Sequence, residues 1–156
     1  MIKINLLVLG DIKEKYLKEA IAEYSKRIGR FAELKIVELK ENAPKNNTSG
    51  EILNCLKKDA KELKKYIKGY PICLDVKGKI LTSEDFANKI QKIALTSSEI
   101  TFIIGASNGI DETIKQLCKE KLSFSAMTFP HQLMRVILLE QIYRSYRIIN
   151  HEPYHK

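Results

Sequence analysis

The densest set of side chains suited to acid-base or anion-binding chemistry lies in residues 129–156, FPHQLMRVILLEQIYRSYRIINHEPYHK. Guanidinium groups bind phosphate and carboxylate oxygens, and an imidazole gains or loses a proton near neutral pH. Such groups are poor material for a hydrophobic core, so their density predicts an anion site. Spacing alone leaves open whether they meet in space. The candidate members are Arg135, Arg144, Arg147, His151, Tyr154 and His155.

A long helix must position these groups. Pro130 suits a first helical turn, where its missing N–H would have no partner, and no glycine or proline follows until Pro153. We therefore predict a helix over residues 131–147. It is either a central core helix or one whose second face meets another subunit, and we favour the second. Its two faces carry Leu133, Val136, Ile137 and Glu140 on one side and Met134, Leu138, Ile142 and Tyr146 on the other.

Length and composition indicate one domain spanning residues 1–156. The formal net charge of +8 favours contact with polyanions such as nucleic acid, although many other small proteins are basic too. Cys55, Cys73 and Cys118 show no CxxC spacing, so we expect neither a disulfide framework nor a metal site. Free thiols fit a reducing cytoplasm, and the lack of a long apolar run predicts a protein that does not cross a membrane.

Apolar runs alternate with helical patterns along the chain, which predicts an α/β fold with a mostly parallel sheet flanked by helices on both faces. Residues 100–104 are almost continuously branched and apolar, so they should form the central strand. The other expected strands are residues 2–9, 34–39 and 70–76, the last followed by a KGK turn. The expected helices are residues 12–28, 51–68, 83–96 with Ser83 as cap, and 111 to about 121 with Asp111 as cap.

Two stretches have an open interpretation. Residues 41–50, ENAPKNNTSG, should be a mobile loop, which either closes over a substrate or merely connects two elements. The helix after it carries a lysine stripe, Lys57, Lys61, Lys64, Lys65 and Lys68. A solvated helix face explains this stripe, and phosphate contact is less favoured because Asp59 and Glu62 lie between the lysines.

The turn after the central strand, IIGASNGID, brings Gly105 and Gly109 to the carboxyl end of the sheet, where ligands of parallel sheets bind. The G-x-x-x-G spacing also fits an ordinary tight turn, and it lacks the dinucleotide fingerprint and the phosphate-loop lysine. The segment LSFSAMTFP, residues 122–130, is either a short strand or an extended pocket wall. Such a wall would offer backbone N–H and C=O groups to a planar ligand.

Three motifs together resemble a known family: FIIGASNGI, LSFSAMTFPHQLMRVILLEQIYR and the ending PYHK. Over essentially its whole length the chain is similar to the bacterial ribosomal large-subunit RNA pseudouridine N3-methyltransferases, of the SPOUT superfamily. The resemblance implies a SPOUT-type α/β fold with a deep C-terminal trefoil knot and a homodimer. It also implies S-adenosylmethionine as cofactor and 23S rRNA in the assembled ribosome as substrate.

By motif position, the resemblance implies a cofactor pocket that includes Leu74, Gly105, Phe124, Ser125, Ala126, Met127, Thr128 and Phe129. Ala106 departs from the family's usual second glycine, which puts in doubt how closely the backbone approaches the cofactor there. The sulfonium of the cofactor makes its methyl group electrophilic, so neither a metal nor a covalent enzyme intermediate is required. Catalysis then consists of alignment and proton removal.

The resemblance also implies roles for the tail. N3 of pseudouridine carries a proton that must leave, and we expect His155 or Tyr154 to handle it. His155 is favoured because an unperturbed imidazole titrates nearest to neutrality. Arg144 is expected to anchor the RNA or the charge that develops on the base. His131 should belong to the helix start and the pocket rim, with a structural role.

Two other functions stay open on sequence alone. One is a methyltransferase of the same superfamily that acts on a transfer RNA or on another ribosomal RNA position. The other is a non-catalytic ribosome-binding or assembly factor, to which only Ala106 points. A small-molecule dehydrogenase is disfavoured because the dinucleotide fingerprint is missing.

Overall fold

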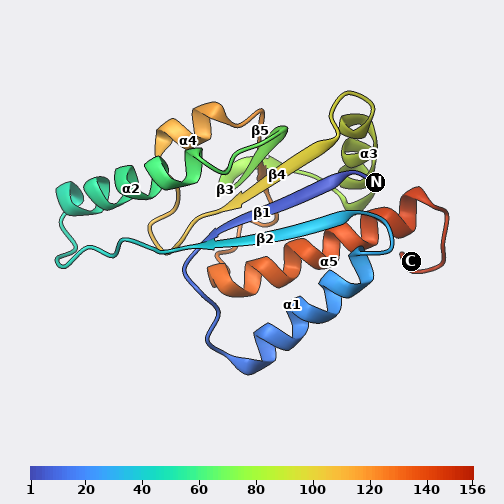
Figure 1. Ribbon diagram of the computed structural model, residues 1–156, viewed down its shortest axis with the longest axis horizontal. Helices are drawn as coiled ribbons and strands as arrows, with labels where there is room; N and C mark the ends of the chain where they lie inside the picture. Colours follow the sequence, from blue (N-terminus) through green and yellow to red (C-terminus); the bar gives the residue numbers. More distant parts are fainter.

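The computed structural model describes residues 1–156 as one five-stranded sheet with helices on both faces (Figure 1). The strand order is β2-β1-β4-β3-β5, and every neighbouring pair is parallel, which confirms the predicted fold class and the central strand. The strands are β1 (Lys3–Leu9), β2 (Glu33–Leu39), β3 (Tyr70–Ile80), β4 (Glu99–Ile104) and β5 (Glu120–Ser123). The helices are α1 (Lys15–Ile28), α2 (Ser49–Lys64), α3 (Ser83–Ala94), α4 (Glu112–Leu117) and α5 (His131–Ile149).

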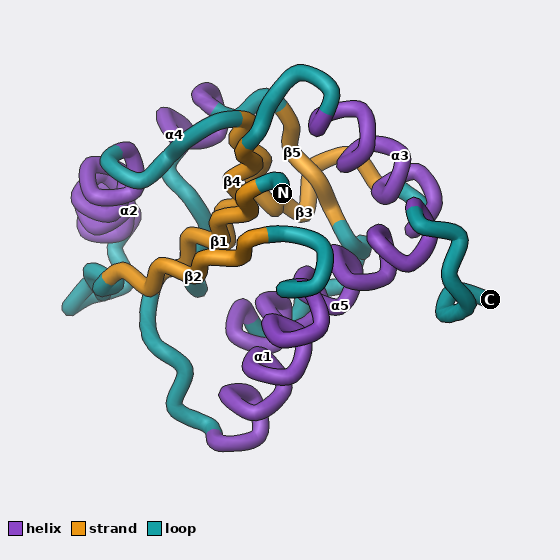
Figure 2. Tube along the Cα trace, turned by 45° about the vertical axis from the view of Figure 1, so that its right-hand side comes forward, coloured by secondary structure: helices purple, strands orange, loops and turns teal.

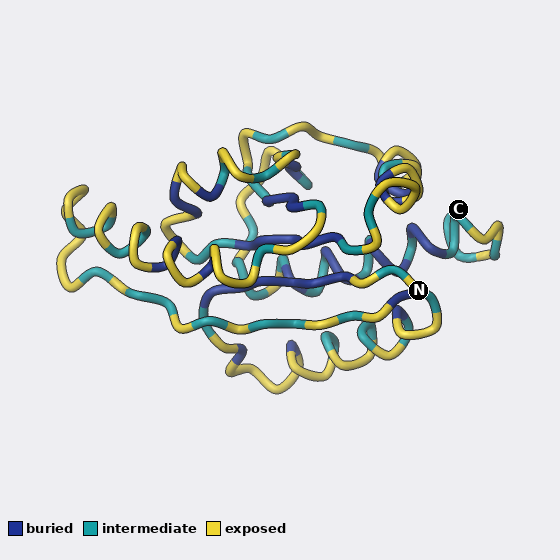
Figure 3. The backbone as a smooth tube through the Cα atoms, turned by 45° about the horizontal axis from the view of Figure 1, so that its top comes forward, coloured by how far each residue is buried: buried dark blue, intermediate teal, exposed yellow.

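Successive residues of β1 enter two separate cores, because side chains alternate across a strand. Ile4 and Leu6 pack in the larger core with residues of α1, α3 and α5, whereas Leu7 and Leu9 pack in the smaller core with residues of α2 and α4. Figure 2 shows α2 and α4 on the side of the sheet opposite α1 and α5. In Figure 3 the buried residues, drawn in dark blue, lie largely along the inner strands. Burial on both faces explains why these strands read as almost continuous apolar runs.

Helix α5 packs against both α1 and α3 and runs close to its predicted bounds. One of its two predicted faces, with Leu138, Ile142 and Tyr146, is buried in the larger core. The other face is only partly covered within the chain: Leu133 is 38% exposed, whereas Val136 and Ile137 are half-buried. The chain therefore leaves a partly exposed apolar strip along α5, formed by these three residues.

Strand β3 is longer than predicted. The expected KGK turn after residue 76 is wrong, because the strand continues to Ile80 with a register shift between Leu74 and Lys79 along β5. Gly78 permits this course: a Cβ at this position would lie 2.7 Å from the backbone carbonyl carbon of Lys121. The glycine that indicated a turn instead allows two strands to approach closely.

Several helix ends also differ from the prediction. Helix α1 begins at Lys15 rather than at residue 12, and the Ile12 N–H donates to the Glu38 carboxylate at 3.1 Å. Thr82 caps α3 by accepting the Asp85 N–H at 3.0 Å, so the predicted Ser83 cap is wrong. Asp111 caps α4 as predicted, but α4 ends at Leu117 because the chain enters β5 at Glu120. Helix α2 ends at Lys64, four residues before its predicted end.

The segment before α2 is a loop over residues 40–48, and the last two residues of the predicted loop belong to α2 instead. Within this loop the Asn42 backbone N–H and side-chain amide both donate to Asp59, at 3.0 and 2.8 Å. Its expected mobility stays a prediction, and so does the C-terminal knot. No helix of the chain combines the length and the apolar character that crossing a membrane requires.

Candidate active site

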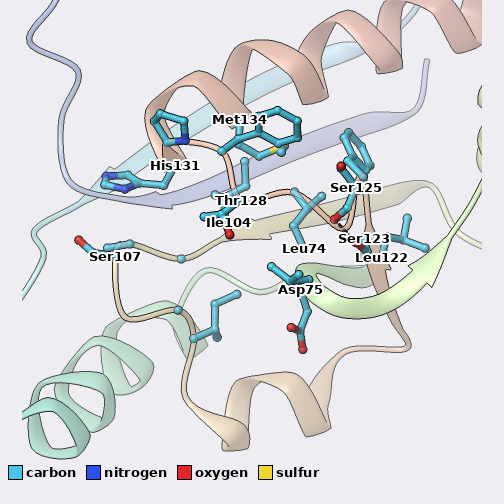
Figure 4. A pocket seen from close by; sticks show the side chains of 18 of the residues that line it. Leu74, Asp75, Ile104, Ser107, Leu122, Ser123, Ser125, Thr128, His131 and Met134 are labelled. Carbon is cyan, nitrogen blue, oxygen red and sulfur yellow. Dashed lines mark hydrogen bonds between the residues drawn. The ribbon is translucent and has the colours of Figure 1, made fainter.

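A cavity of about 600 Å³ lies at the carboxyl ends of β4 and β5 and beside the middle of β3. Its walls come from the Leu74 region of β3, the turn after β4, the segment after β5 and the first turn of α5. Figure 4 shows Ser107 and His131 toward one end and Ser123 and Ser125 toward the other. Parallel strands place their carboxyl ends at one edge, which is where open α/β sheets bind ligands. The size suits a nucleoside-sized ligand.

The residues assigned to the cofactor by resemblance surround this cavity, with one exception. The lining includes Leu74, Gly105, Phe124, Ser125, Met127, Thr128 and Phe129, whereas Ala126 is exposed and does not line it. His131 lies in the rim, where it was expected. Burial and the nearby positive charge of Arg135 lower the pKa of His131, which keeps this imidazole neutral at neutral pH. Of the predicted segment 122–130, the first two residues end strand β5, and most of the others form a pocket wall.

The chemistry of this wall fits a ligand with a planar, hydrogen-bonding edge. Residues 124–129 make no backbone–backbone hydrogen bonds, so several of their N–H and C=O groups have no partner in the protein. The segment is shaped instead by hydroxyl groups: Ser123 donates to the Ser125 carbonyl at 2.9 Å, and the Met127 N–H donates to the Ser125 hydroxyl at 2.9 Å. Apolar side chains flanking free backbone groups match what the adenosine part of S-adenosylmethionine requires.

The turn after β4 depends on its glycines. A Cβ on Gly105 would lie 2.4 Å from the Gly109 carbonyl oxygen, and Gly109 has a φ of 82°, in the left-handed region. Ala106 bridges to Gly109 and accepts its N–H at 2.9 Å, so it takes part in closing the turn and also lines the cavity. An alanine is therefore compatible with this turn, whereas a side chain at Gly105 is not.

An ion pair in one wall was missed by the sequence reasoning. The Lys115 ammonium lies 3.2 Å from Asp75, and both residues line the cavity. Burial raises the pKa of Asp75, but the Lys77 N–H and Lys115 outweigh it, so the net pKa is lowered. The pKa of Lys115 is raised, because Asp75 more than offsets burial. Adjacency to Leu74 was the available signal, but Asp75 was assigned to the predicted strand 70–76 and Lys115 to a separate helix, with no pairing expected.

Arg144, Tyr154 and His155, the three predicted catalytic residues, do meet in space. Arg144 lies 3.1 Å from Nδ1 of His155, and its guanidinium carbon lies 4.7 Å from the centre of the Tyr154 ring. Two carboxylates that sequence reasoning missed complete the group. Glu140 pairs with Arg144 at 2.7 Å and accepts the Tyr154 hydroxyl at 3.2 Å, while Glu84 lies 2.6 Å from Nε2 of His155. We call these five residues the tail cluster.

The other candidates of the predicted anion site lie outside the tail cluster. Arg135 is 1% exposed and donates to the carbonyl oxygens of Leu9 and Gly10 at 2.8 and 3.0 Å, so its placement in this site is wrong. Arg147 pairs with Glu152 at 2.9 Å and holds the turn after α5. His151 is exposed with a φ of 53° in that turn. The buried guanidinium of Arg135 is thus held by backbone carbonyl groups at the end of β1 and by the Glu38 carboxylate at 3.2 Å.

The tail cluster and the cavity are separate within one chain. No residue of the tail cluster lines the cavity, which meets α5 only at its first turn through His131 and Met134. Along the helix axis, Arg144 lies about 20 Å from His131, since an α-helix rises about 1.5 Å per residue. Figure 1 shows the tail turning back beside the far end of α5. One chain alone therefore does not bring the predicted proton-handling groups to the predicted methyl donor.

The chain is similar to known methyltransferases over almost its whole length. Residues 2–155 match the family model described as "Predicted SPOUT methyltransferase". A chain of Methanococcus maripaludis is 52% identical over 98% of this chain and 99% of its own length. The "Ribosomal RNA large subunit methyltransferase H" of Alkaliphilus oremlandii is 50% identical, with the same coverage of both chains.

A solved structure shares the fold at low sequence similarity. The tRNA (m1G37) methyltransferase from Aquifex aeolicus superposes with a TM-score of 0.54 at 17% identity, over 91% of this chain and 69% of its own. At that identity the likeness concerns the fold alone.

Proposed function

Because the chain belongs to the SPOUT methyltransferase family, for which S-adenosylmethionine is the methyl donor, we propose that it methylates N3 of a pseudouridine in 23S rRNA of the assembled ribosome. The ribosomal substrate is supported by the name of a full-length relative at 50% identity. The observation that carries the proposal is the cavity itself, which gathers all but one of the cofactor residues assigned by resemblance. Such an enzyme would work in the cytoplasm, where ribosomes are assembled.

The residues of the chain must align the base and remove one proton. When bound, the donor supplies an electrophilic methyl carbon on a positively charged sulfur. The N–H bond at N3 breaks and leaves its electron pair on N3, which forms the new bond to the methyl carbon, while the carbon–sulfur pair stays on sulfur. The released proton goes to a base of the protein, and we assign His155 to that role.

Tyr154 is the weaker candidate for the base. Burial, reinforced by the Glu140 carboxylate, raises the pKa of Tyr154 above its usual value near 10, so the phenol keeps its proton at neutral pH. It can still donate a hydrogen bond to the base or hold Glu140 in place. Arg144 is suited to stabilise negative charge on the carbonyl oxygens that flank N3.

A homodimer would bring the separated parts together. The apolar strip on α5 is only partly covered within the chain, and Glu140 of the tail cluster lies on the same predicted helix face. We therefore propose that the strip is the subunit interface and that the tail cluster of one subunit completes the cavity of the other. Each dimer would then hold two composite sites.

The exposed face of α2 supports contact with RNA phosphates. Lys57, Lys61 and Lys64 are exposed and form no ion pair. Of the two acids that dilute the lysine stripe in the sequence, Asp59 is buried at 3% exposure and bonded to Asn42, and Glu62 pairs with Lys65 at 2.8 Å. Of these two acids only Glu62 therefore remains on the surface, which favours electrostatic contact with rRNA.

The test is incubation of the protein with labelled S-adenosylmethionine and ribosomes from a strain lacking it, followed by mapping of the methylated nucleotide. The expected result is one label at N3 of a pseudouridine in 23S rRNA. Label on transfer RNA alone would overturn the substrate. Binding of the donor without transfer to any RNA would favour a binding or assembly factor.

A further inference from the structure

Both ring nitrogens of His155 are engaged in the tail cluster. Nδ1 lies 3.1 Å from an Nη1 nitrogen of Arg144, and Nε2 lies 2.6 Å from an oxygen of Glu84. The two contacts differ in kind, because a guanidinium has only donors and a carboxylate has only acceptors. Arg144 therefore donates to the lone pair of Nδ1, and Nε2 carries the proton that it donates to Glu84. This pair of contacts selects one tautomer of the ring.

The selected tautomer is the one that general-base catalysis at Nδ1 requires. A carboxylate that accepts the far N–H of an imidazole holds the ring in orientation and stabilises the imidazolium that forms on proton uptake. Arg144 occupies the lone pair of Nδ1 while no base is bound. When the substrate binds, a carbonyl oxygen of the nucleobase could accept the Arg144 hydrogen bond in place of Nδ1. Nδ1 would then be free to accept the N3 proton, so the same exchange of hydrogen bonds would anchor the nucleobase and prepare proton removal.

We propose that Glu84 is a positioning residue for methyl transfer, which holds His155 in the Nε2–H tautomer and stabilises its protonated form. This inference rests on the proposed role of His155 as the base. Glu84 itself touches neither the base nor the donor and acts through His155.

The surroundings of Glu84 fix its position relative to α5. It lies in the first turn of α3, whose start is capped by Thr82, and Phe86 and Ile90 bury that helix in the larger core. Ser83 donates to the side chain of Gln141 at 2.8 Å, which joins the start of α3 directly to α5. The hydrogen bond from His155, followed by one from the Glu84 N–H itself, lowers the pKa of Glu84, so the carboxylate stays charged at neutral pH.

Three variants and one control test the proposal. Glu84→Ala removes the acceptor, Glu84→Gln keeps an acceptor without the charge, and His155→Ala removes the group through which Glu84 acts. Asp85→Asn is the control: Asp85 is an exposed acid in the same first turn, and no contact of its carboxylate with the tail is present. The control distinguishes two effects: the loss of a negative charge at the start of a helix, and the loss of the contact with His155.

The first measurement is kcat for ribosome methylation. Because the contact is partly exposed, Glu84→Ala should lower kcat by about 10- to 100-fold, with Glu84→Gln intermediate and Asp85→Asn unchanged. The dissociation constant of S-adenosylmethionine should not change. Adding Glu84→Ala to His155→Ala should cause no further loss. An unchanged kcat in Glu84→Ala, or additive losses in the double variant, would overturn the proposal.

The second measurement needs no activity, so it separates this inference from the proposed function. Nitrogen-15 NMR of the ring in the full-length protein distinguishes the two imidazole tautomers. The spectra are recorded in an Arg144→Ala background, which removes the other contact that selects the tautomer. There His155 should carry the proton on Nε2 with Glu84 or Glu84→Gln present, and Glu84→Ala should give a mixture of tautomers. The same spectrum with Glu84 and with Glu84→Ala in this background would overturn the positioning role. Failure of ribosome methylation alongside the expected spectra would instead refute the assigned reaction.

Discussion

The cavity and the tail cluster consist of different kinds of groups. The cavity uses strand ends, apolar side chains and backbone groups without protein partners, whereas the tail cluster consists of five polar side chains that satisfy one another. The cavity is shaped for a ligand that supplies its missing hydrogen bonds. The tail cluster already pairs its charges within the chain. Under the proposed function, donor binding and proton transfer would therefore depend on separate parts of the molecule.

The largest expected effect comes from the tail cluster. His155→Ala should lower kcat for methylation by about 100- to 10,000-fold, the usual contribution of a general base. The affinity for S-adenosylmethionine, measured by calorimetry, should stay at the wild-type value because no tail residue lines the cavity. A matching loss of donor affinity would show that the two regions are not separate.

A substitution in the cavity should instead weaken binding of the methyl donor. Gly105→Val would force a side chain against the Gly109 carbonyl oxygen, which lies 2.4 Å from the position of a Cβ. The strain of overpacking, about 1–3 kcal/mol, should weaken donor binding about tenfold or more. The control is Gly50→Ala in α2, where no atom lies within 4 Å of the added Cβ, and it should leave donor binding unchanged. Equal donor affinity in Gly105→Val and wild type would place the donor elsewhere.

A smaller effect is expected from the lysine face of α2, which belongs to neither region. Lys57→Glu with Lys61→Glu should raise KM for ribosomes several-fold and reduce the slope of log K against log salt by about 1–2, because two phosphate contacts are lost. The control reverses Lys18 and Lys26 on α1, which are also exposed and form no ion pair. Identical effects of the two pairs would mean that overall charge, rather than the α2 face, attracts the RNA.

The smallest effect concerns the ion pair in the cavity wall. Lys115→Met should lower the free energy of unfolding at pH 7 by about 1 kcal/mol or less. The pKa of Asp75 is lowered in the folded state, so its contribution is present above its unfolded value of 3.8 and is lost as the pH falls through the folded value. The difference from wild type, followed by urea unfolding, should therefore shrink below pH 4. A difference in the free energy of unfolding that grows below pH 4 would contradict the ion pair between Asp75 and Lys115.

The sequence predicted these regions unequally, and for physical reasons. The order of strands and helices follows from apolar periodicity, which two-sided burial makes strong. The cavity followed from strand ends and from the family resemblance. The Glu84–His155 contact joins residues 71 positions apart, so no local pattern could reveal it. Arg135 was misplaced because buried carbonyl groups, which the sequence does not display, hold its guanidinium.

The local errors share one cause. A glycine between two lysines predicts a turn, and only the nearness of β5 shows that Gly78 instead permits a longer strand. The pairing of Asp75 with Lys115 in the cavity wall likewise joins a predicted strand to a predicted helix far away in the sequence. Tertiary proximity decided both cases, as it does wherever local preferences conflict with packing.

The central claim is that the cavity of one subunit works with the tail cluster of another, and mixed dimers test it most directly. Gly105→Val and His155→Ala chains carrying different affinity tags are co-expressed, and dimers with both tags are purified and assayed on ribosomes. Each mixed dimer would hold one intact composite site, so activity should return to about half of the wild-type value per dimer. Dimers of either variant alone should stay well below that value when the donor concentration does not saturate the weakened Gly105→Val cavity. Mixed dimers as inactive as their parents would contradict the claim.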